Sequence, residues 1–119
     1  MMSELSELTR QFQNDPAHPK AVRELAALGE VRRYRKATVL IHEADRGDTL
    51  FVVMEGRVKV FSTDANGREI TFGVIGTGDY FGEMALDGGL RSASVITLEA
   101  SVCAIIGRDV LLAYIAREP

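Results

Sequence analysis

From Glu30 onward the sequence is divided into short runs rich in Val, Ile, Phe and Thr. Gly, Asp and Asn separate these runs at intervals of about ten residues, a spacing typical of antiparallel strands joined by tight turns. This pattern is the strongest constraint on the fold, and it favours a β-sandwich or β-roll. The predicted strands are Val31–Arg35, Thr38–Ile41, Leu50–Met54, Arg57–Phe61, Glu69–Ile75, Ala93–Leu98 and Val102–Ile106.

Two of these runs alternate cleanly between apolar and polar residues, as half-buried strands do. The alternation puts Val58 and Val60 on one inward face. It also puts Phe72 on an inward face, together with its apolar neighbours two positions away on either side. The segment Asp64–Ala65–Asn66–Gly67 between the two runs predicts a hairpin, because Asn-Gly accepts the positive φ of a tight turn.

Helices are predicted on both sides of the strand-rich region. Apolar residues at helical spacing favour one helix within residues 1–19 and a second over Lys20–Leu28, with Gly29 as its C-terminal stop. A last helix begins near Arg108. The predicted fold class is therefore α+β, an antiparallel, jelly-roll-like β-roll flanked by N-terminal and C-terminal helices. We divide the chain into an N-terminal helical segment, residues 1–19, and a β-roll domain, residues 20–119, that ends in a truncated helix.

Composition narrows the class of protein. The chain has 119 residues, which fits one domain, and 46% are apolar and 26% charged, as in a folded soluble protein. One cysteine rules out an internal disulfide framework, and no apolar run approaches the length of a membrane span. A net charge of −3 is the wrong sign for gripping phosphate backbones. We expect a cytoplasmic domain that contacts neither membrane nor DNA, with its one basic cluster on an exposed strand edge (Arg32, Arg33, Arg35 and Lys36).

Residues suited to metal or nucleophile chemistry are few. A metal-binding cupin needs several histidines on neighbouring strands, whereas this chain has only His18, between prolines, and His42, at a strand end. Cys103 lies in an apolar strand, where a buried, inert thiol is expected. No serine stands in a G-x-S-x-G elbow. We therefore predict no metal site, no cofactor and no enzymatic activity.

The stretch from Phe81 to Val95 interrupts the strand pattern. Residues 82–86 have the composition of one helical turn, with an acid, Glu83, near its start. The amides at a helix N-terminus attract an anion, and Arg91, just before the next strand, adds a planar, bidentate phosphate ligand. Small residues around it let a ligand approach the backbone. The stretch therefore predicts a pocket for a small phosphate ester.

These residues also carry a family resemblance. The sequence F-G-E-M-A-L-(x)₄-R-S-A-S-V resembles the phosphate-binding cassette of cyclic nucleotide-binding domains, and G-D-T-L-F-(x)₄-G, which begins at Gly47, resembles an earlier signature of that family. The resemblance runs from about Lys20 to Tyr114 and is nearest to the catabolite-activator (Crp–Fnr) group. The cassette is one residue shorter than the commoner form, and Leu90 stands where proline is frequent.

The resemblance implies a role for each matching residue. Glu83 would bind the ribose 2′-hydroxyl beside the Gly82 backbone, and Arg91 would hold the cyclic phosphate. The Ser92 hydroxyl and the Ala93 amide would complete the phosphate site. The amides of Met84 and Ala85 would join them, Phe72 would touch the base or ribose, and Gly47, Asp48 and Gly56 would be structural.

The implied function is a regulatory domain that senses a cyclic nucleotide, with a lean towards cAMP over cGMP, and relays a conformational change without turnover. Such domains act in signal transduction and transcription regulation, and the effector domain or partner cannot be read from the sequence. The alternative is a β-roll kept as an interaction or scaffold module whose pocket binds nothing. A nucleotide titration separates the two.

Overall fold

A computed structural model describes residues 3–82 and 90–117. The predictions for Glu83, Met84 and Ala85, and for the helical turn that contains them, lie outside these residues. The helices are α1 (Glu4–Gln13), α2 (Lys20–Leu28) and α3 (Arg108–Arg117), and the strands are β1 (Glu30–Tyr34), β2 (Val39–Ile41), β3 (Thr49–Glu55), β4 (Arg57–Thr63), β5 (Glu69–Gly76), β6 (Tyr80–Phe81), β7 (Ser94–Thr97) and β8 (Ser101–Gly107).

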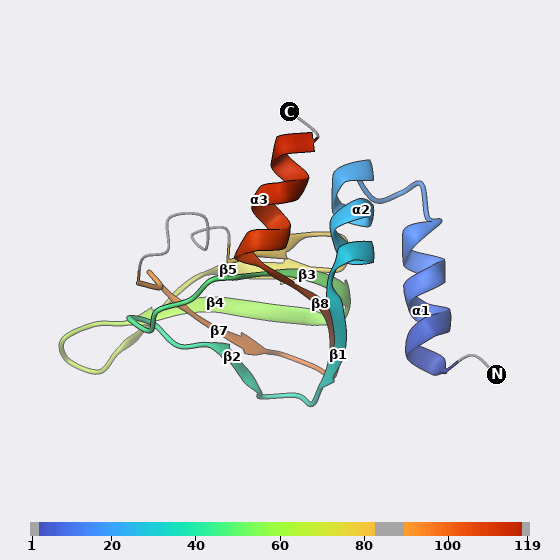
Figure 1. Ribbon diagram of the computed structural model, residues 1–119. Coiled ribbons are helices and arrows are strands. Elements are labelled where there is room, and N and C mark those ends of the chain that lie inside the picture. Colours follow the sequence, from blue (N-terminus) through green and yellow to red (C-terminus); the bar gives the residue numbers. More distant parts are fainter. Residues whose placement is uncertain (1–2, 83–89, 118–119) are drawn as a thin grey trace.

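The strands form two antiparallel sheets that lie one over the other (Figure 1). The first sheet has the order β1-β8-β3-β6 and the second has the order β2-β7-β4-β5. Chain neighbours such as β2 and β3 therefore belong to different sheets, as in a roll. The α+β β-roll predicted from the sequence is confirmed.

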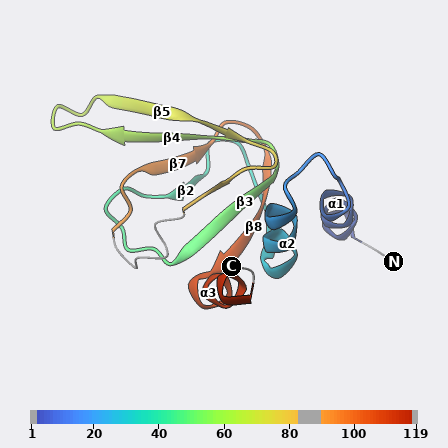
Figure 2. The ribbon, with the colours of Figure 1, turned by 90° about the horizontal axis from the view of Figure 1, so that it is seen from above.

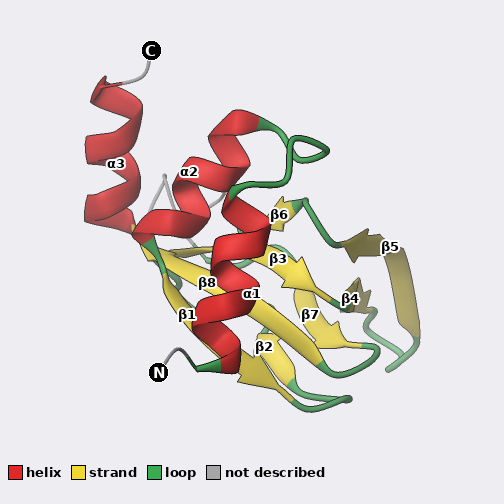
Figure 3. Cartoon of the chain, turned by 90° about the vertical axis from the view of Figure 1, so that its right-hand side faces the viewer, coloured by secondary structure: helices red, strands yellow, loops and turns green. Residues whose placement is uncertain are grey.

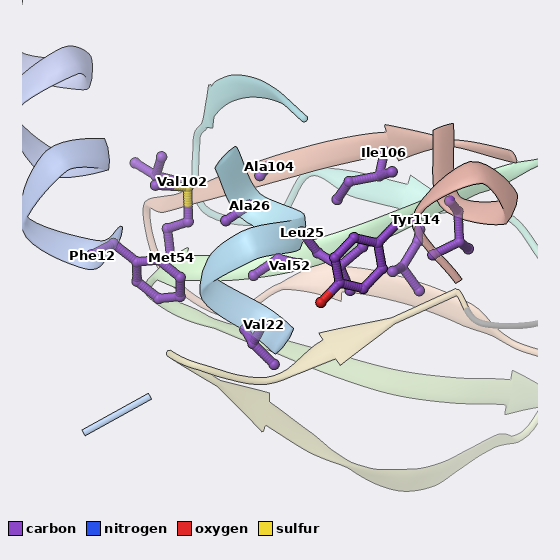
Figure 4. Packing of buried hydrophobic residues seen from close by; sticks show 12 residues of the cluster. Phe12, Val22, Leu25, Ala26, Val52, Met54, Val102, Ala104, Ile106 and Tyr114 are labelled. Atoms are coloured by element: carbon purple, nitrogen blue, oxygen red, sulfur yellow. The ribbon is translucent and has the colours of Figure 1, made fainter. Parts of the chain in front are cut away.

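The central strands of the first sheet are buried on both faces. Leu50, Val52 and Met54 of β3 belong to one cluster, which packs against the helices. Phe51 and Val53, which alternate with them, belong to a second cluster between the two sheets. Because each face of β3 is covered, the strand is a nearly continuous apolar run. Figure 4 shows the helix-side cluster, with Leu25 and Ala26 of α2 above Val52.

The helices all lie on the side of the first sheet (Figure 3). α1 begins at the Ser3 cap, whose hydroxyl accepts from the Ser6 amide at 3.0 Å. α2 and α3 are joined by a 2.8 Å hydrogen bond from the Tyr114 hydroxyl to Glu24 Oε2. No helix within the described ranges is long and apolar enough to cross a membrane.

The predicted strands agree with the observed ones to within two residues at either end, and both predicted N-terminal helices are confirmed. The structure also contains β6, which lies outside the seven predicted strands and pairs Phe81 with Phe51 and Tyr80 with Val52. A strand of two residues is too short to show an apolar periodicity in the sequence, and it forms because it pairs with β3. The β4–β5 turn has Gly67 at φ 81°, as the Asn-Gly signal predicted.

The inward face predicted for Phe72 is wrong. Phe72 is 62% exposed, and Ile70 and Val74 are exposed as well. β5 is the edge strand of its sheet, and its register with β4 shifts opposite Val60 and Phe61, which changes the face that each residue occupies. Figure 2 shows the β4–β5 hairpin extending past the other strands of its sheet, so its far part has no opposing layer.

Candidate functional site

A cavity of about 160 Å³ opens between the two sheets at the end where β6 and β7 approach each other. Its floor is apolar, because Ile41, Phe81 and Val95 also belong to the cluster between the sheets. Its polar wall comes from the segment that leads into β7. The lining residues are Ile41, Val60, Ile75, Tyr80, Phe81, Gly82, Arg91, Ser92, Ala93 and Val95.

Arg91 supplies the positive charge of this wall. Although it is only 7% exposed, it lines the cavity. Its Nη1 donates to the Gly82 carbonyl at 3.1 Å, and its Nη2 donates to the Thr49 carbonyl at 2.8 Å and to Thr49 Oγ1 at 3.2 Å. A guanidinium so deep in the protein needs such acceptors, because burying a charge without hydrogen bonds is costly. The cavity therefore has a charged group of fixed orientation.

Four of the predicted ligand-binding residues meet at this cavity: Gly82, Arg91, Ser92 and Ala93. Gly82 has φ 90°, a conformation that favours glycine. Ser92 is exposed and Ala93 is half-buried, so both residues are accessible at the opening of the cavity. Phe72 is not among the lining residues, and its expected contact with the ligand has no support in the described geometry.

The three residues predicted to be structural differ from one another. Gly56 has φ 99°, and a Cβ there would lie 2.8 Å from the Ala100 carbonyl oxygen, so the backbone itself requires glycine. A Cβ at Gly47 would instead lie 2.0 Å from Arg91 Nε. Asp48 is exposed and lines a second hollow, of about 200 Å³, that Arg91 also borders. Gly47 is therefore linked to the site, whereas Gly56 shapes only the turn between β3 and β4.

A larger hollow, of about 400 Å³, lies beside α1 and does not suit an anion. Its lining includes the carboxylates of Glu4, Glu7, Asp15 and Glu55, which repel a phosphate. The only basic group that lines it is His18, whose ring stacks on Phe12 with the ring centres 4.4 Å apart. The charge of this lining therefore disfavours a phosphate, in contrast to the cavity at Arg91.

Other chemistry has little basis in the described residues. Within residues 3–82 and 90–117 no group of three or more His, Cys, Asp or Glu side chains could hold a metal ion. Burial raises the pKa of the Cys103 thiol to about 12, so it stays protonated and unreactive at neutral pH. The basic residues Arg32 and Arg33 lie on the edge strand β1 and form ion pairs with Glu30 and Glu4.

Several residues of the site were not singled out from the sequence. Thr49 holds Arg91 from a different sheet, and Ile41, Val60, Ile75 and Tyr80 line the cavity. Thr49 belongs to the G-D-T-L-F signature, so the signal was present without a role attached to it. The apolar lining residues alternate like any buried strand residue, and only the packing of the two sheets distinguishes them.

The two-sheet roll, with helices on one side and a buried arginine on the wall of a cavity, has the features of a ligand-binding domain. Residues 31–118 match the family model of the cyclic nucleotide-binding domain, so the chain belongs to this family. Its relatives place it in the Crp–Fnr-like group. Over 89 residues, 74% of this chain and 41% of the relative, it is 37% identical to the cyclic AMP receptor protein of Thermus thermophilus.

Solved structures agree with this assignment. The catabolite activator protein of Thermus thermophilus matches with a TM-score of 0.76 and 32% identity, over 89% of this chain and 50% of that one. The EAL enzyme Bd1971 in its cAMP-bound form matches with a TM-score of 0.70 and 33% identity, over 76% of this chain and 24% of that one. Its cGMP-bound form matches with a TM-score of 0.68, 33% identity and the same coverage. The chain spans about half the length, or less, of these relatives.

Proposed function

We propose that this chain binds a cyclic nucleotide, cAMP in the first place, in the cavity at Arg91, and that occupancy of the cavity shifts the domain between two conformational states. The activity proposed is sensing without turnover, as in a receptor, because a sensor acts through differential affinity for two states. The observation that carries the proposal is the buried, oriented guanidinium of Arg91 on the wall of a cavity whose floor is apolar.

The charge and shape of the cavity support a cyclic phosphate as the anchoring group. A guanidinium binds a phosphate through two parallel hydrogen bonds, and such charge-assisted bonds are stronger than neutral ones. Ser92 and Ala93 stand beside Arg91 and would add a hydroxyl and an amide. The apolar floor suits the ribose and purine, which carry no charge.

The remaining contacts follow from the family resemblance. Glu83 would accept from the ribose 2′-hydroxyl, and the amides of Met84 and Ala85 would complete the phosphate site. Phosphate and ribose are common to cAMP and cGMP, and Bd1971, a neighbour in structure, has been solved in a cAMP-bound and a cGMP-bound form. We therefore expect cGMP to bind as well, with less than about tenfold difference in affinity, or about 1.4 kcal/mol.

Thermal denaturation with added nucleotide tests the proposal. At about 100 times its Kd, cAMP should stabilise the folded state by roughly 2.7 kcal/mol. Arg91→Ala should lower cAMP affinity by about 30- to 1,000-fold, because the phosphate would enter the cavity without its charge partner. Arg91→Lys should recover only part of the loss, since an ammonium cannot form the bidentate contact.

Two controls define the outcome. 5′-AMP, which carries the same base and ribose but an open phosphate, should stabilise the protein much less. Arg57→Ala removes an arginine on β4 that lines no part of the cavity and should leave cAMP affinity unchanged. A folded protein whose melting temperature does not respond to either cyclic nucleotide would show that the roll is a scaffold module.

A further inference from the structure

Arg91 connects the two sheets of the roll. It precedes β7 of the second sheet, yet its side chain ends against Thr49 of β3 and against Gly82, which follows β6. The strands β3 and β6 both belong to the first sheet. Its main chain is held as well, since its amide donates to the Asp45 carbonyl and its carbonyl accepts from the Ala44 amide, both at 2.8 Å. The main chain and the side chain of Arg91 are therefore both hydrogen-bonded to neighbouring segments of the chain.

Thr49 contributes two of the three hydrogen bonds from the guanidinium that have been described. Both involve Nη2, which donates to the carbonyl oxygen at 2.8 Å and to Oγ1 at 3.2 Å. The carbonyl oxygen is fixed by the strand, because Thr49 is the first residue of β3 and pairs with Gly107 of β8. The hydroxyl is the part of this arrangement that depends on the side chain at position 49.

Close contacts with the backbone confine the guanidinium in addition to its hydrogen bonds. A Cβ at Gly47 would lie 2.0 Å from Nε and 2.4 Å from Cζ, so the loop passes directly against the guanidinium. A Cβ at Gly82 would lie 3.1 Å from Nη1. The side chain thus sits in a slot formed by backbone on two sides and by Thr49 at its end.

The acceptors on Thr49 and Gly82 are neutral oxygens that orient the guanidinium. A long side chain that is already ordered loses little further freedom when a ligand binds, which raises affinity. We propose that Thr49 is a positioning residue for Arg91, and that its hydroxyl holds the guanidinium in the orientation that receives the nucleotide phosphate. This inference rests on the proposed function of the cavity.

The test compares two substitutions at position 49 by calorimetric titration with cAMP. Thr49→Val keeps the shape of the side chain and removes the hydroxyl, and it should weaken binding about three- to tenfold. Thr49→Ser keeps the hydroxyl and should stay within about twofold of the parent protein. Thr63→Val, at an exposed threonine of β4 outside the cavity, is the matched control and should leave the affinity unchanged.

A double-mutant cycle separates positioning from a general weakening of the fold. In an Arg91→Lys background the planar group that Thr49 orients is absent, so Thr49→Val should then change affinity less than about twofold. An equal loss in both backgrounds, or no loss in either, would overturn the positioning role while the proposed function stands. Failure of the parent protein to bind cAMP or cGMP would instead remove the proposed function, and this inference with it.

Discussion

The Arg91 end of the cavity and the end of the β4–β5 hairpin are built in different ways. At the Arg91 end, a charged side chain is buried, and it reaches from the segment before β7 of the second sheet to backbone carbonyls of Thr49 and Gly82 on the side of the first sheet. The β4–β5 hairpin, by contrast, carries Phe72, Val74 and Ile70 as exposed residues on an edge strand. We therefore expect the Arg91 end to recognise the charge that the two cyclic nucleotides share. The apolar part of the hairpin is left uncovered by the described residues.

The largest effect is expected from a substitution that displaces the Arg91 guanidinium while leaving Arg91 itself unchanged. Gly47→Ala puts a Cβ 2.0 Å from Arg91 Nε, and the guanidinium, as the end of a side chain, can swing aside with little movement of the backbone. Because the swing breaks its contacts with Thr49 and Gly82, cAMP affinity should fall by about 30-fold or more, measured by titration calorimetry. The melting temperature should fall as well, because the buried guanidinium loses acceptors.

Two glycines serve as controls for this prediction. Gly76→Ala adds a Cβ that meets nothing within 4 Å and should be neutral in both measurements. Gly56→Ala forces a left-handed residue against backbone and should lower the melting temperature more than Gly47→Ala does. If Gly47→Ala binds cAMP like the parent protein, the orientation of Arg91 does not limit binding.

A smaller loss of cAMP affinity is expected from substitutions at the predicted ribose contact. By resemblance Glu83 would bind the 2′-hydroxyl, so Glu83→Ala should weaken cAMP binding by about tenfold and Glu83→Gln by less. 2′-Deoxy-cAMP should bind worse than cAMP to the parent protein but about equally to Glu83→Ala. Losses that simply add would show that Glu83 does not contact the ribose. Glu99→Ala, at a surface ion pair with Arg57, is the matched control.

The hairpin end should respond least to substitution. Phe72 lies outside the cavity, and Phe72→Ala should therefore change cAMP affinity less than about threefold. Val60→Ala, which removes an apolar lining residue nearby on β4, should cost more. A large loss for Phe72→Ala alone would mean that the hairpin folds over the ligand, and the contrast between the two ends would disappear.

Cys103 of β8 belongs to the buried cluster between the two sheets and reports on the stability of the fold. Its folded-state pKa is raised by burial to about 12 from an ordinary 9.0, so the unfolded chain loses this proton first. This contribution to stability is complete below pH 9 and is lost as the pH rises from 9 towards 12, by about 1 kcal/mol at pH 10. Urea denaturation should show a shallower alkaline decline in Cys103→Ala, with cAMP affinity unchanged within twofold. An identical decline in both proteins would contradict the prediction.

Much of the architecture follows from local pattern. Alternating and continuous apolar runs between turn residues were enough to locate the seven longer strands, and Asn66-Gly67 was enough to place a hairpin. Arg91 was singled out because an arginine before a strand, close to the start of a helical turn, is an anion-binding pattern, and the family resemblance added Gly82, Ser92 and Ala93. These features depend on residues close together in the chain.

What the tertiary structure decided depends on residues far apart in the chain. The face of Phe72 depends on a register shift between β4 and β5 and on the absence of an opposing layer within the described residues, and neither leaves a signal in an alternating run. The two-residue strand β6 exists because β3 lies beside it. The slot around Arg91 joins residues 47, 49 and 82 through hydrogen bonds and close approach across two sheets. The sequence alone determined which groups are present, and only the packing of one sheet on the other determined how the arginine is held.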